Sequence, residues 1–503
     1  MPDGHDMPAA SLPRLPPASA GPLLRWTAVR LIRDHWWALY LMVVSAAAFA
    51  AFGDWAFDDP FITYRYSANL LAGRGFVYNP GLRVLSTTTP LYALLLALVG
   101  LAVPDLPLTS NLLGAVSLAA GGLILHRLSH RRQSPAVGWA ALLLYPTWPL
   151  LYTTLGGEMP LYLLFCLGTL LAYAEARYAL VGVLGGLALL SRADAGVLLA
   201  LLGLWHLLRR PRQLPWRALA ALGIVILPWV LFAWSYFGSP LPVTLAAKQH
   251  QARLPGCPSF AAGFVQLVSG YSSYWQYWMA AALAGLGIIY AAGWHRRWLL
   301  VLAWPVAYFV SYAALGVSRY FWYYAPLVPG VVVAIGLGAA ACQAVLSRLT
   351  NRWLGGLLAI VLLVLFAAFH VGRLEWLRSR PDHRVLIYRA AGEWLRQNTP
   401  GESSVGTLEV GIIGYYSMRP MVDFAGLIQP EVAQRLGPDF TYEDAALWAV
   451  EQYRPDYLVL NPTWFPRLME RHVSPSCRVA HMLPGADRGY EGDLVIYQCT
   501  GEW

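Results

Sequence analysis

The stretch that decides the fold of this chain reads FDDPFITYRYSANLLAGRGFVYNPG over residues 57–81 and continues to TTTPLY at residues 87–92. It directly follows the first long apolar run, residues 36–55. An aspartate followed by a proline, as at Asp59, typically begins a helix, and Gly73 is a typical helix end. The sequence therefore predicts a short helix close to a membrane surface, with two adjacent carboxylates at its start.

On this predicted helix Phe61, Arg65 and Asn69 follow one another at four-residue spacing and share one face. Asp58 and Asp59 allow two interpretations. They can be an ordinary helix cap in a polar loop. They can also be a functional pair, because charges at the edge of a membrane span are costly and tend to mark sites. The stretch alone leaves both interpretations open.

The composition is that of a polytopic membrane protein. Of the 503 residues, 57% are hydrophobic and only 13% are charged, which is far too apolar for a soluble chain. The net charge of +9 comes from arginines clustered between apolar runs, the distribution typical of cytoplasmic loops. The positive charge therefore does not indicate a nucleic-acid partner.

Apolar runs and the positive-inside rule together predict about eleven transmembrane helices. The expected spans are residues 36–55, 111–128, 136–152, 161–174, 179–190, 195–208, 218–237, 275–294, 298–315, 326–345 and 354–371. The short pair 179–190 and 195–208 forms a hairpin with a polar tip, and broken helices are tolerated only where they line protein or a cavity. The apolar piece 90–103 is too short to cross and stays in the first external loop.

Three regions follow from this topology. Residues 1–34 are a cytoplasmic N-terminal tail, residues 35–371 a transmembrane domain, and residues 372–503 a soluble domain outside the cell. The transmembrane domain has two long external loops, residues 56–110 and 238–274. The chain is therefore predicted to be a multi-pass protein of the plasma membrane.

The C-terminal region alternates helical and β patterns, which predicts an α/β fold. A helix is expected over residues 384–396, and strands are expected at 404–407 and 456–460. Cys477 and Cys499 both lie in this region, and outside the cell they could form a disulfide.

The polar residues that interrupt the apolar pattern all fall on the predicted outer face. They are Asp58, Asp59, Arg65, Glu158, Arg192, Asp194, Lys248 and Arg319. Carboxylates at this depth can act as general bases, and cations beside them can hold a phosphate. The set suits a lipid phosphate whose tail stays in the bilayer. Neither a Ser-His-Asp pattern nor a metal-ligand spacing occurs in the sequence, and a divalent cation is left undecided.

Several of these residues also have a structural interpretation. Arg192 and Asp194 can pair with each other across the hairpin tip, which is the favoured interpretation. Glu158 can be a polar loop residue, and Arg319 an interfacial anchor among aromatic residues. Lys248 is different, because it is the only lysine in the chain and follows a proline-rich segment, which favours a functional role.

Several motifs, in this order, resemble those of GT-C-fold glycosyltransferases. They are residues 58–81 with 89–91, Gly157–Glu158, Ser191–Gly196, Phe237–Lys248 and Arg319–Tyr320. The resemblance is greatest to the bacterial group that includes the cell-wall arabinofuranosyltransferases. The lipid A aminoarabinose transferases and protein O-mannosyltransferases are more distant.

The resemblance implies a polyprenyl-phosphate-linked sugar donor, and transfer on the outer face to a hydroxyl of a glycan, lipid or protein. It implies a first-loop aspartate as general base; Asp58 matches the usual position, with Asp59 beside it. The residues implied in binding the donor phosphate or substrate are Arg65, Glu158, Lys248, Arg319 and Tyr320, supported by Asn69, Arg192 and Asp194. Residues 82–88 depart from the family pattern, so the sugar and the acceptor stay unassigned.

Two other functions are compatible with a polytopic membrane chain. A transporter or flippase of a lipid-linked or small polar substrate would show inverted repeats and polar residues near the membrane midplane, and the sequence shows neither. An envelope assembly or sensor protein would have its active part in the C-terminal domain. The predicted function is therefore glycosyl transfer, with the transporter as the alternative.

Overall fold

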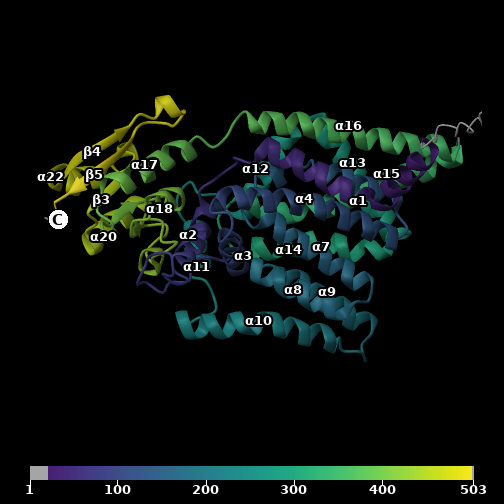
Figure 1. The fold of residues 1–503 in the computed structure, drawn as a ribbon, viewed down its shortest axis with the longest axis horizontal. Helices are drawn as coiled ribbons and strands as arrows, with labels where there is room; N and C mark the ends of the chain where they lie inside the picture. The colour runs from purple at the N-terminus through teal and green to yellow at the C-terminus, as the bar shows by residue number, and fades with distance from the viewer. Residues whose placement is uncertain (1–20, 350, 501–503) are drawn as a thin grey trace, which may run out of the picture.

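The structure is a computed structural model that describes residues 21–349 and 351–500. A bundle of helices fills one part of the molecule, and a small α/β domain lies at one end of it (Figure 1). The long helix α16 (Arg352–Arg378) runs along the bundle and leads into that domain. The helix continues past residue 371, the predicted end of the transmembrane domain.

The bundle contains one helix, or a broken pair of helices, for each expected span. Besides α16, these helices are α1 (Gly21–Phe52), α4 (Leu106–Arg131), α5 (Pro135–Leu144), α6 (Pro149–Tyr152), α7 (Met159–Ala174), α8 (Tyr178–Ser191), α9 (Ala195–Arg209), α10 (Trp216–Phe237), α13 (Trp275–Gly293), α14 (Leu299–Leu315) and α15 (Val328–Leu349). The expected span 136–152 is divided between α5 and α6. Helix α1 begins at Gly21, so the expected N-terminal tail is helical from there to residue 34, and residues 1–20 lie outside the described part.

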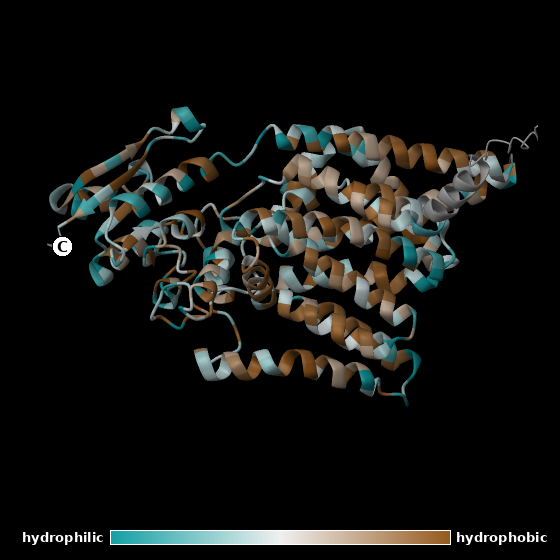
Figure 2. Cartoon of the chain, in the orientation of Figure 1, coloured by the Kyte–Doolittle hydropathy of each residue, from teal (hydrophilic) through white to brown (hydrophobic). Residues whose placement is uncertain are grey.

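Six of the described helices are long and apolar enough to cross a membrane on their own. They cover Asp34–Phe52, Leu106–Arg131, Trp216–Phe237, Arg296–Leu315, Phe321–Leu349 and Trp353–Arg378. Shorter apolar helices, such as α7, α8 and α9, pack among them. Figure 2 shows apolar residues along these helices and polar ones gathered at their ends. The polytopic helical fold is confirmed, and the count of about eleven crossings stays a prediction.

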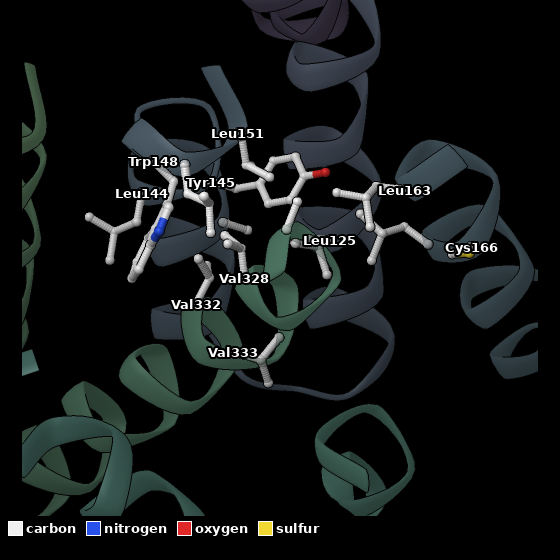
Figure 3. Close-up of a cluster of buried hydrophobic side chains, with 14 of the residues drawn as sticks. Leu125, Leu144, Tyr145, Trp148, Leu151, Leu163, Cys166, Val328, Val332 and Val333 are labelled. Carbon is white, nitrogen blue, oxygen red and sulfur yellow. The ribbon is translucent and has the colours of Figure 1, made fainter. Parts of the chain in front are cut away.

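The bundle is held together by close helix contacts and a large apolar core. In Figure 3 the ring of Tyr145 lies among side chains of α4, α7 and α15, including Leu125, Leu163 and Val328. Helices α13 and α15 approach so closely that a Cβ on Gly287 would lie 1.9 Å from the carbonyl oxygen of Ala334. Small residues at such contacts let two backbones meet in an apolar environment.

The two loops predicted to be external lie between the bundle and the C-terminal domain (Figure 1). The first contains α2 (Asp59–Leu71) and α3 (Pro90–Gly100), and the second contains α11 (Thr244–Gln251) and α12 (Phe260–Ser272). Helix α2 begins at the predicted aspartate. It ends two residues before Gly73, whose φ of 71° is in the left-handed region that glycine adopts at little cost. The decisive stretch therefore folds as its sequence predicts.

The C-terminal domain is built on a five-stranded sheet with the order β2-β1-β3-β5-β4. The strands are β1 (Val405–Thr407), β2 (Met421–Asp423), β3 (Tyr457–Leu460), β4 (Cys477–Leu483) and β5 (Leu494–Cys499). The pairs β1–β2 and β1–β3 are parallel, whereas β5 runs antiparallel to both β3 and β4. The helices are α17 (Arg384–Asn398), α18 (Gly411–Ser417), α19 (Pro430–Ala433), α20 (Tyr442–Tyr453), α21 (Pro466–Leu468) and α22 (Ser474–Ser476).

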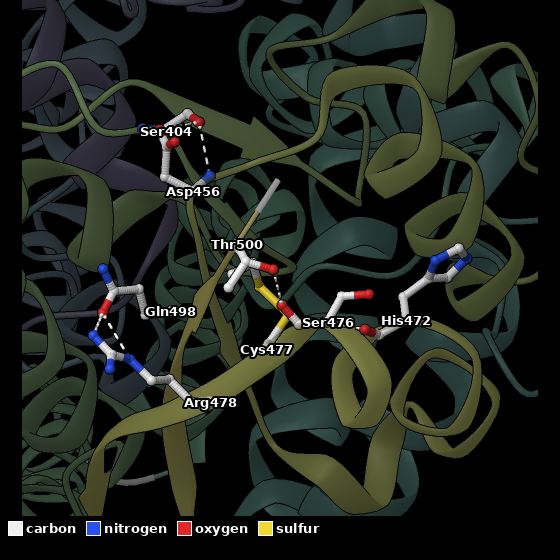
Figure 4. The surroundings of a disulfide bond; sticks show 9 residues. Ser404, Asp456, His472, Ser476, Cys477, Arg478, Gln498 and Thr500 are labelled. Atoms are coloured by element: carbon white, nitrogen blue, oxygen red, sulfur yellow. Dashed lines mark hydrogen bonds between the residues drawn. A yellow bond between two sulfur atoms is a disulfide. The ribbon is translucent and has the colours of Figure 1, made fainter. Parts of the chain in front are cut away.

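A disulfide joins Cys477 and Cys499, which are directly opposite each other on β4 and β5 (Figure 4). Next to it, the Thr500 hydroxyl donates to the carbonyl of Ser476, and Arg478 donates to the side chain of Gln498. The disulfide therefore closes the edge hairpin of the sheet at its open end. The pairing suggested by the sequence is present.

Replacing Cys477 and Cys499 together by alanine should lower the free energy of unfolding of the C-terminal domain by about 3 kcal/mol, because the bond closes a loop of 22 residues. Thermal unfolding of the purified protein in detergent, followed by near-UV circular dichroism, measures the loss. Cys342→Ala, at a free cysteine in α15, is the control and should leave the C-terminal transition in place. A double variant with an unchanged transition would contradict the expectation.

Candidate functional site

A cavity of about 480 Å³ lies where the bundle meets the two external loops. Its charged lining consists of Asp59, Glu158, Arg192, Asp194 and Lys248. These residues come from α2, the start of α7, the turn between α8 and α9, and α11. The structure thus brings five of the sequence-predicted site residues to one cavity.

Asp59 and Lys248 form an ion pair on the wall of this cavity. The Lys248 ammonium donates to Oδ2 of Asp59 at 3.0 Å and lies 4.1 Å from the ring centre of Tyr320 and 5.1 Å from that of Trp322. The Lys248 side chain is 9% exposed and that of Asp59 34%, so the carboxylate is the more accessible partner. Burial alone would lower the pKa of Lys248, but Asp59 and two tyrosines more than offset this and hold the pKa above its ordinary value.

Arg192 is the centre of a second charged group in the cavity. Its guanidinium donates to Oε1 of Glu158 at 2.6 Å, to Oδ2 of Asp194 at 2.8 and 3.0 Å, and to the Tyr312 hydroxyl at 3.1 Å. The predicted Arg192–Asp194 pair is therefore present, and Glu158 joins it. Because most of its N–H groups already have partners, Arg192 braces the hairpin tip against α7 and α14.

Asp58 points away from the cavity, toward the C-terminal domain. Its Oδ2 accepts the backbone N–H of Gly411 at 3.0 Å and its Oδ1 that of Ile412 at 2.8 Å, both at the start of α18. The approach is close, since a Cβ on Gly411 would lie 2.1 Å from the carbonyl oxygen of Asp58. Asp58 is not among the residues that line the cavity, so the structure separates the two aspartates by position.

The carboxylates at this junction have raised pKa values. Burial, with a contribution from the charge of Asp59, raises the pKa of Asp58 to about 6, although the two backbone hydrogen bonds oppose the shift. Burial and the nearby charge of Asp58 raise the pKa of Glu409 to about 8. Arg384, 3.3 Å from Glu409, opposes that shift. A pKa of about 8 keeps Glu409 mostly protonated near neutral pH, whereas Asp58, with a pKa of about 6, is then mostly ionised.

Arg65 and Asn69 shape the first loop. Arg65 is completely buried and donates to the carbonyls of Tyr78 and Arg419 at 3.1 and 2.7 Å, and also to that of Gly414. Asn69 donates to the carbonyls of Val77 and Tyr78. Neither side chain lines the cavity, so the placement of Arg65 does not support the predicted contact with a donor phosphate.

Arg319 and Tyr320 are neighbours in sequence but differ in their position relative to the cavity. Arg319 is exposed, donates to Gln266, and does not line the cavity. Tyr320 lies behind the cavity wall, where its ring contacts the Lys248 ammonium and its hydroxyl donates to Gln251 at 2.8 Å. Lys248 and Arg319 were both implied in binding the donor phosphate. Of these two cations, Lys248 lines the cavity and Arg319 does not.

The sequence analysis missed part of the site. The cavity wall also contains the hydroxyl-bearing residues Thr63, Thr87 and Thr89, and the junction depends on Gly411 and Glu409. A signal for Thr63 was available, since it follows Asp59 at four-residue spacing on one helix. Gly411 has no local signal, because its partner Asp58 is 353 residues away.

Metal-binding groups were sought among the described residues as well. In that part of the chain, no three or more His, Cys, Asp and Glu side chains are placed together to hold a metal ion. The cavity carboxylates Glu158 and Asp194 bind Arg192 instead.

Comparisons with known proteins agree on the fold. ArnT from Cupriavidus metallidurans is similar over 92% of this chain and 98% of its own. Its structure bound to undecaprenyl phosphate has 15% sequence identity and a TM-score of 0.57. Its apo structure has 14% sequence identity and a TM-score of 0.61. The archaeal oligosaccharyltransferase AglB from Archaeoglobus fulgidus, in complex with an inhibitory peptide and a dolichol-phosphate, is 15% identical with a TM-score of 0.55, over 87% of this chain and 70% of its own.

These similarities show that the chain has the GT-C fold, as the motifs of the first loop predicted. A family model described as a domain of unknown function (DUF8728) matches residues 377–496, which cover most of the C-terminal domain. No curated protein sequence matches the chain.

Gly411→Ala should weaken the contact between the C-terminal domain and the first loop, because the added methyl group would overlap Asp58. Overpacking of this kind costs about 1–3 kcal/mol. Thermal unfolding and limited proteolysis of the segment between α16 and α17 measure the effect. Gly401→Ala is the matched control, since no atom lies within 4 Å of a Cβ there. Equal stability of the two variants would show that the contact is not as close as described.

The raised pKa of Glu409 makes stability depend on pH. Folding raises this pKa from 4.5 to about 8, so the folded state binds more protons than the unfolded state, and stability falls as the pH rises from 4.5 toward 8. The thermal midpoint should therefore rise when the pH is lowered from 8 to 6, and rise less in Glu409→Gln. Glu402→Gln, at an exposed residue, should behave like the wild type. If the thermal midpoint of Glu409→Gln depended on pH as steeply as that of the wild type, the raised pKa of Glu409 would not be the cause of the pH dependence.

Proposed function

We propose that the protein is an integral membrane glycosyltransferase that moves a sugar from a polyprenyl-phosphate donor to a hydroxyl of a cell-envelope glycan, lipid or protein. The observation that carries the proposal is the Asp59–Lys248 pair on the wall of a cavity, in a chain with the GT-C fold. Two proteins with this fold were solved with undecaprenyl phosphate and with a dolichol-phosphate, which supports a polyprenyl carrier for this chain.

Asp59 is the general base in this proposal. Its carboxylate is accessible from the cavity, whereas both oxygens of Asp58 accept backbone N–H groups of α18. Asp59 takes the proton of the acceptor hydroxyl as its oxygen attacks the anomeric carbon of the donor sugar. The bond between that carbon and the phosphate oxygen breaks, and the polyprenyl phosphate leaves with the bonding electrons.

Lys248 holds the donor phosphate. Its ammonium has three N–H donors, and one of them is used by Asp59. Arg192, in contrast, is already neutralised by Glu158 and Asp194. A phosphate arriving at Lys248 competes with Asp59 for the ammonium. Donor binding thereby loosens the ion pair and releases the carboxylate to act as base.

In this proposal the reaction takes place on the extracytoplasmic face of the plasma membrane. The cavity lies at the end of the bundle that carries the C-terminal domain, and that domain contains the Cys477–Cys499 disulfide. Disulfides persist in oxidising compartments outside the cytosol. This supports a cytoplasmic N-terminus and an external active site.

Asp59→Asn should lower the rate of sugar transfer by at least about a hundredfold, the typical contribution of a general base. Asp58→Asn keeps one acceptor oxygen for α18 and should lose less than about tenfold. Asp54→Asn, at an exposed residue just before the loop, is the control. Transfer is measured in reconstituted vesicles with a panel of undecaprenyl-phosphate sugars, after mass spectrometry of the purified protein has identified any bound lipid-linked sugar.

Two outcomes would refute this assignment. If Asp59→Asn, folded and inserted in the membrane, transfers sugar at the wild-type rate, Asp59 is not the base. If Asp58→Asn is inactive while its thermal stability is unchanged, Asp58 has the catalytic role that the resemblance alone implied.

A further inference from the structure

Three threonine hydroxyls form a closed ring on the wall of the cavity. The oxygen of Thr63 lies 3.3 Å from that of Thr87 and 3.2 Å from that of Thr89, and the last two are 3.1 Å apart. All three residues line the cavity although each is less than 10% exposed. The ring joins α2 to the segment before α3.

The bonds within the ring are long. Hydroxyl-to-hydroxyl hydrogen bonds are usually about 2.7–2.8 Å, so all three contacts in the ring are weak. The backbone N–H of Thr89 also reaches the Thr87 oxygen only at 3.3 Å. A hydroxyl can rotate and serve as donor or acceptor. A ligand with hydroxyl groups of its own can therefore replace these weak bonds with shorter ones.

The ring is placed beside the proposed catalytic pair. Thr63 follows Asp59 by four residues in α2, which puts the two side chains roughly 5–6 Å apart on one face. A donor phosphate at Lys248, which contacts Asp59, would bring the sugar attached to it next to the ring. The ring carries no charge, which suits a neutral polyhydroxylated group better than a phosphate or a lipid chain.

We infer that Thr63, Thr87 and Thr89 bind hydroxyl groups of the transferred sugar on the donor. This inference rests on the proposed function and adds to it a subsite that selects for the glycosyl group. Lys248 holds the phosphate, and the threonine ring distinguishes a carrier loaded with sugar from the bare lipid phosphate.

The test compares binding of two kinds of probe by native mass spectrometry. One is undecaprenyl phosphate, and the other is a panel of undecaprenyl-phosphate monosaccharides. Thr63→Val and Thr89→Val should each reduce the preference for the sugar-bearing lipid about three- to tenfold, the effect of one neutral hydrogen bond, and leave binding of undecaprenyl phosphate unchanged. Thr63→Ser should keep the preference. Thr169→Val is the matched control, since its hydroxyl is bonded to the carbonyl of Phe165 within α7.

Each outcome decides the question. An unchanged preference in both valine variants with wild-type thermal stability overturns the inference. Equal losses for the sugar-bearing and the bare lipid overturn it too, because they indicate a packing defect. In the vesicle transfer assay, an effect of the valine variants that is confined to the Michaelis constant of the acceptor assigns the ring to the acceptor and refutes the donor subsite. A wild-type protein that binds none of the probes refutes the proposed function itself, a result distinct from the others.

Discussion

The arrangement of the site depends on the way α18 of the C-terminal domain holds α2 of the first loop. Asp58 accepts two N–H groups at the start of α18, and Arg65 donates to the carbonyl of Gly414 within α18 and to that of Arg419 just beyond it. The N–H groups at the start of a helix and the carbonyls at its end lack partners within the helix. Here the Asp58 carboxylate accepts from the former and the Arg65 guanidinium donates to the latter. Successive residues of a helix point about 100° apart. With Asp58 bound to the C-terminal domain, Asp59 is directed toward the bundle and its cavity.

In the proposed reaction, the charges of the cavity link donor binding to proton transfer. Three carboxylates and two cations line it, and Arg192 is shared by two of the carboxylates. A phosphate in the cavity would therefore bind Lys248 rather than Arg192, and it would compete with Asp59 for the ammonium. In the proposed reaction an arriving phosphate takes over part of the charge interaction of Lys248, and the Asp59 carboxylate is then free to accept the proton of the acceptor hydroxyl.

The fold was largely predictable from sequence, because its signals are local. Apolar runs, an aspartate-proline helix start and a glycine stop determine where α2 and the bundle helices lie. The two cysteines suggested the disulfide, whereas the β4–β5 hairpin that it closes was not predicted. The site was only partly predictable. Asp59 and Glu158 were candidates because charges at a membrane surface are costly, and Lys248 because it is the only lysine in the chain. The structure places all three on one cavity, and their roles are those of the proposal. The different roles of Asp58 and Asp59 could not be predicted, since Asp58 finds its partners 353 and 354 residues away. For the same reason the surroundings of Arg65, which the resemblance implied in binding the donor phosphate, could not be predicted. In the structure it is buried and donates to carbonyls of the first loop and of the C-terminal domain.

The contacts of the C-terminal domain also bear on the interpretation of this region as an independent sensor. The segment matched by the domain of unknown function contains α18 and Glu409, and both face the first loop. Tyr78 and Asn79 of that loop bond to the backbone of the same domain, and Asn79 does so in both directions with Met421. A domain that used these groups to bind a separate partner would have to release α2, and Asp59 would lose its orientation. Hydrophobic side chains of the first loop and of the C-terminal domain also share one core, so releasing α2 would expose apolar surface as well as break these hydrogen bonds.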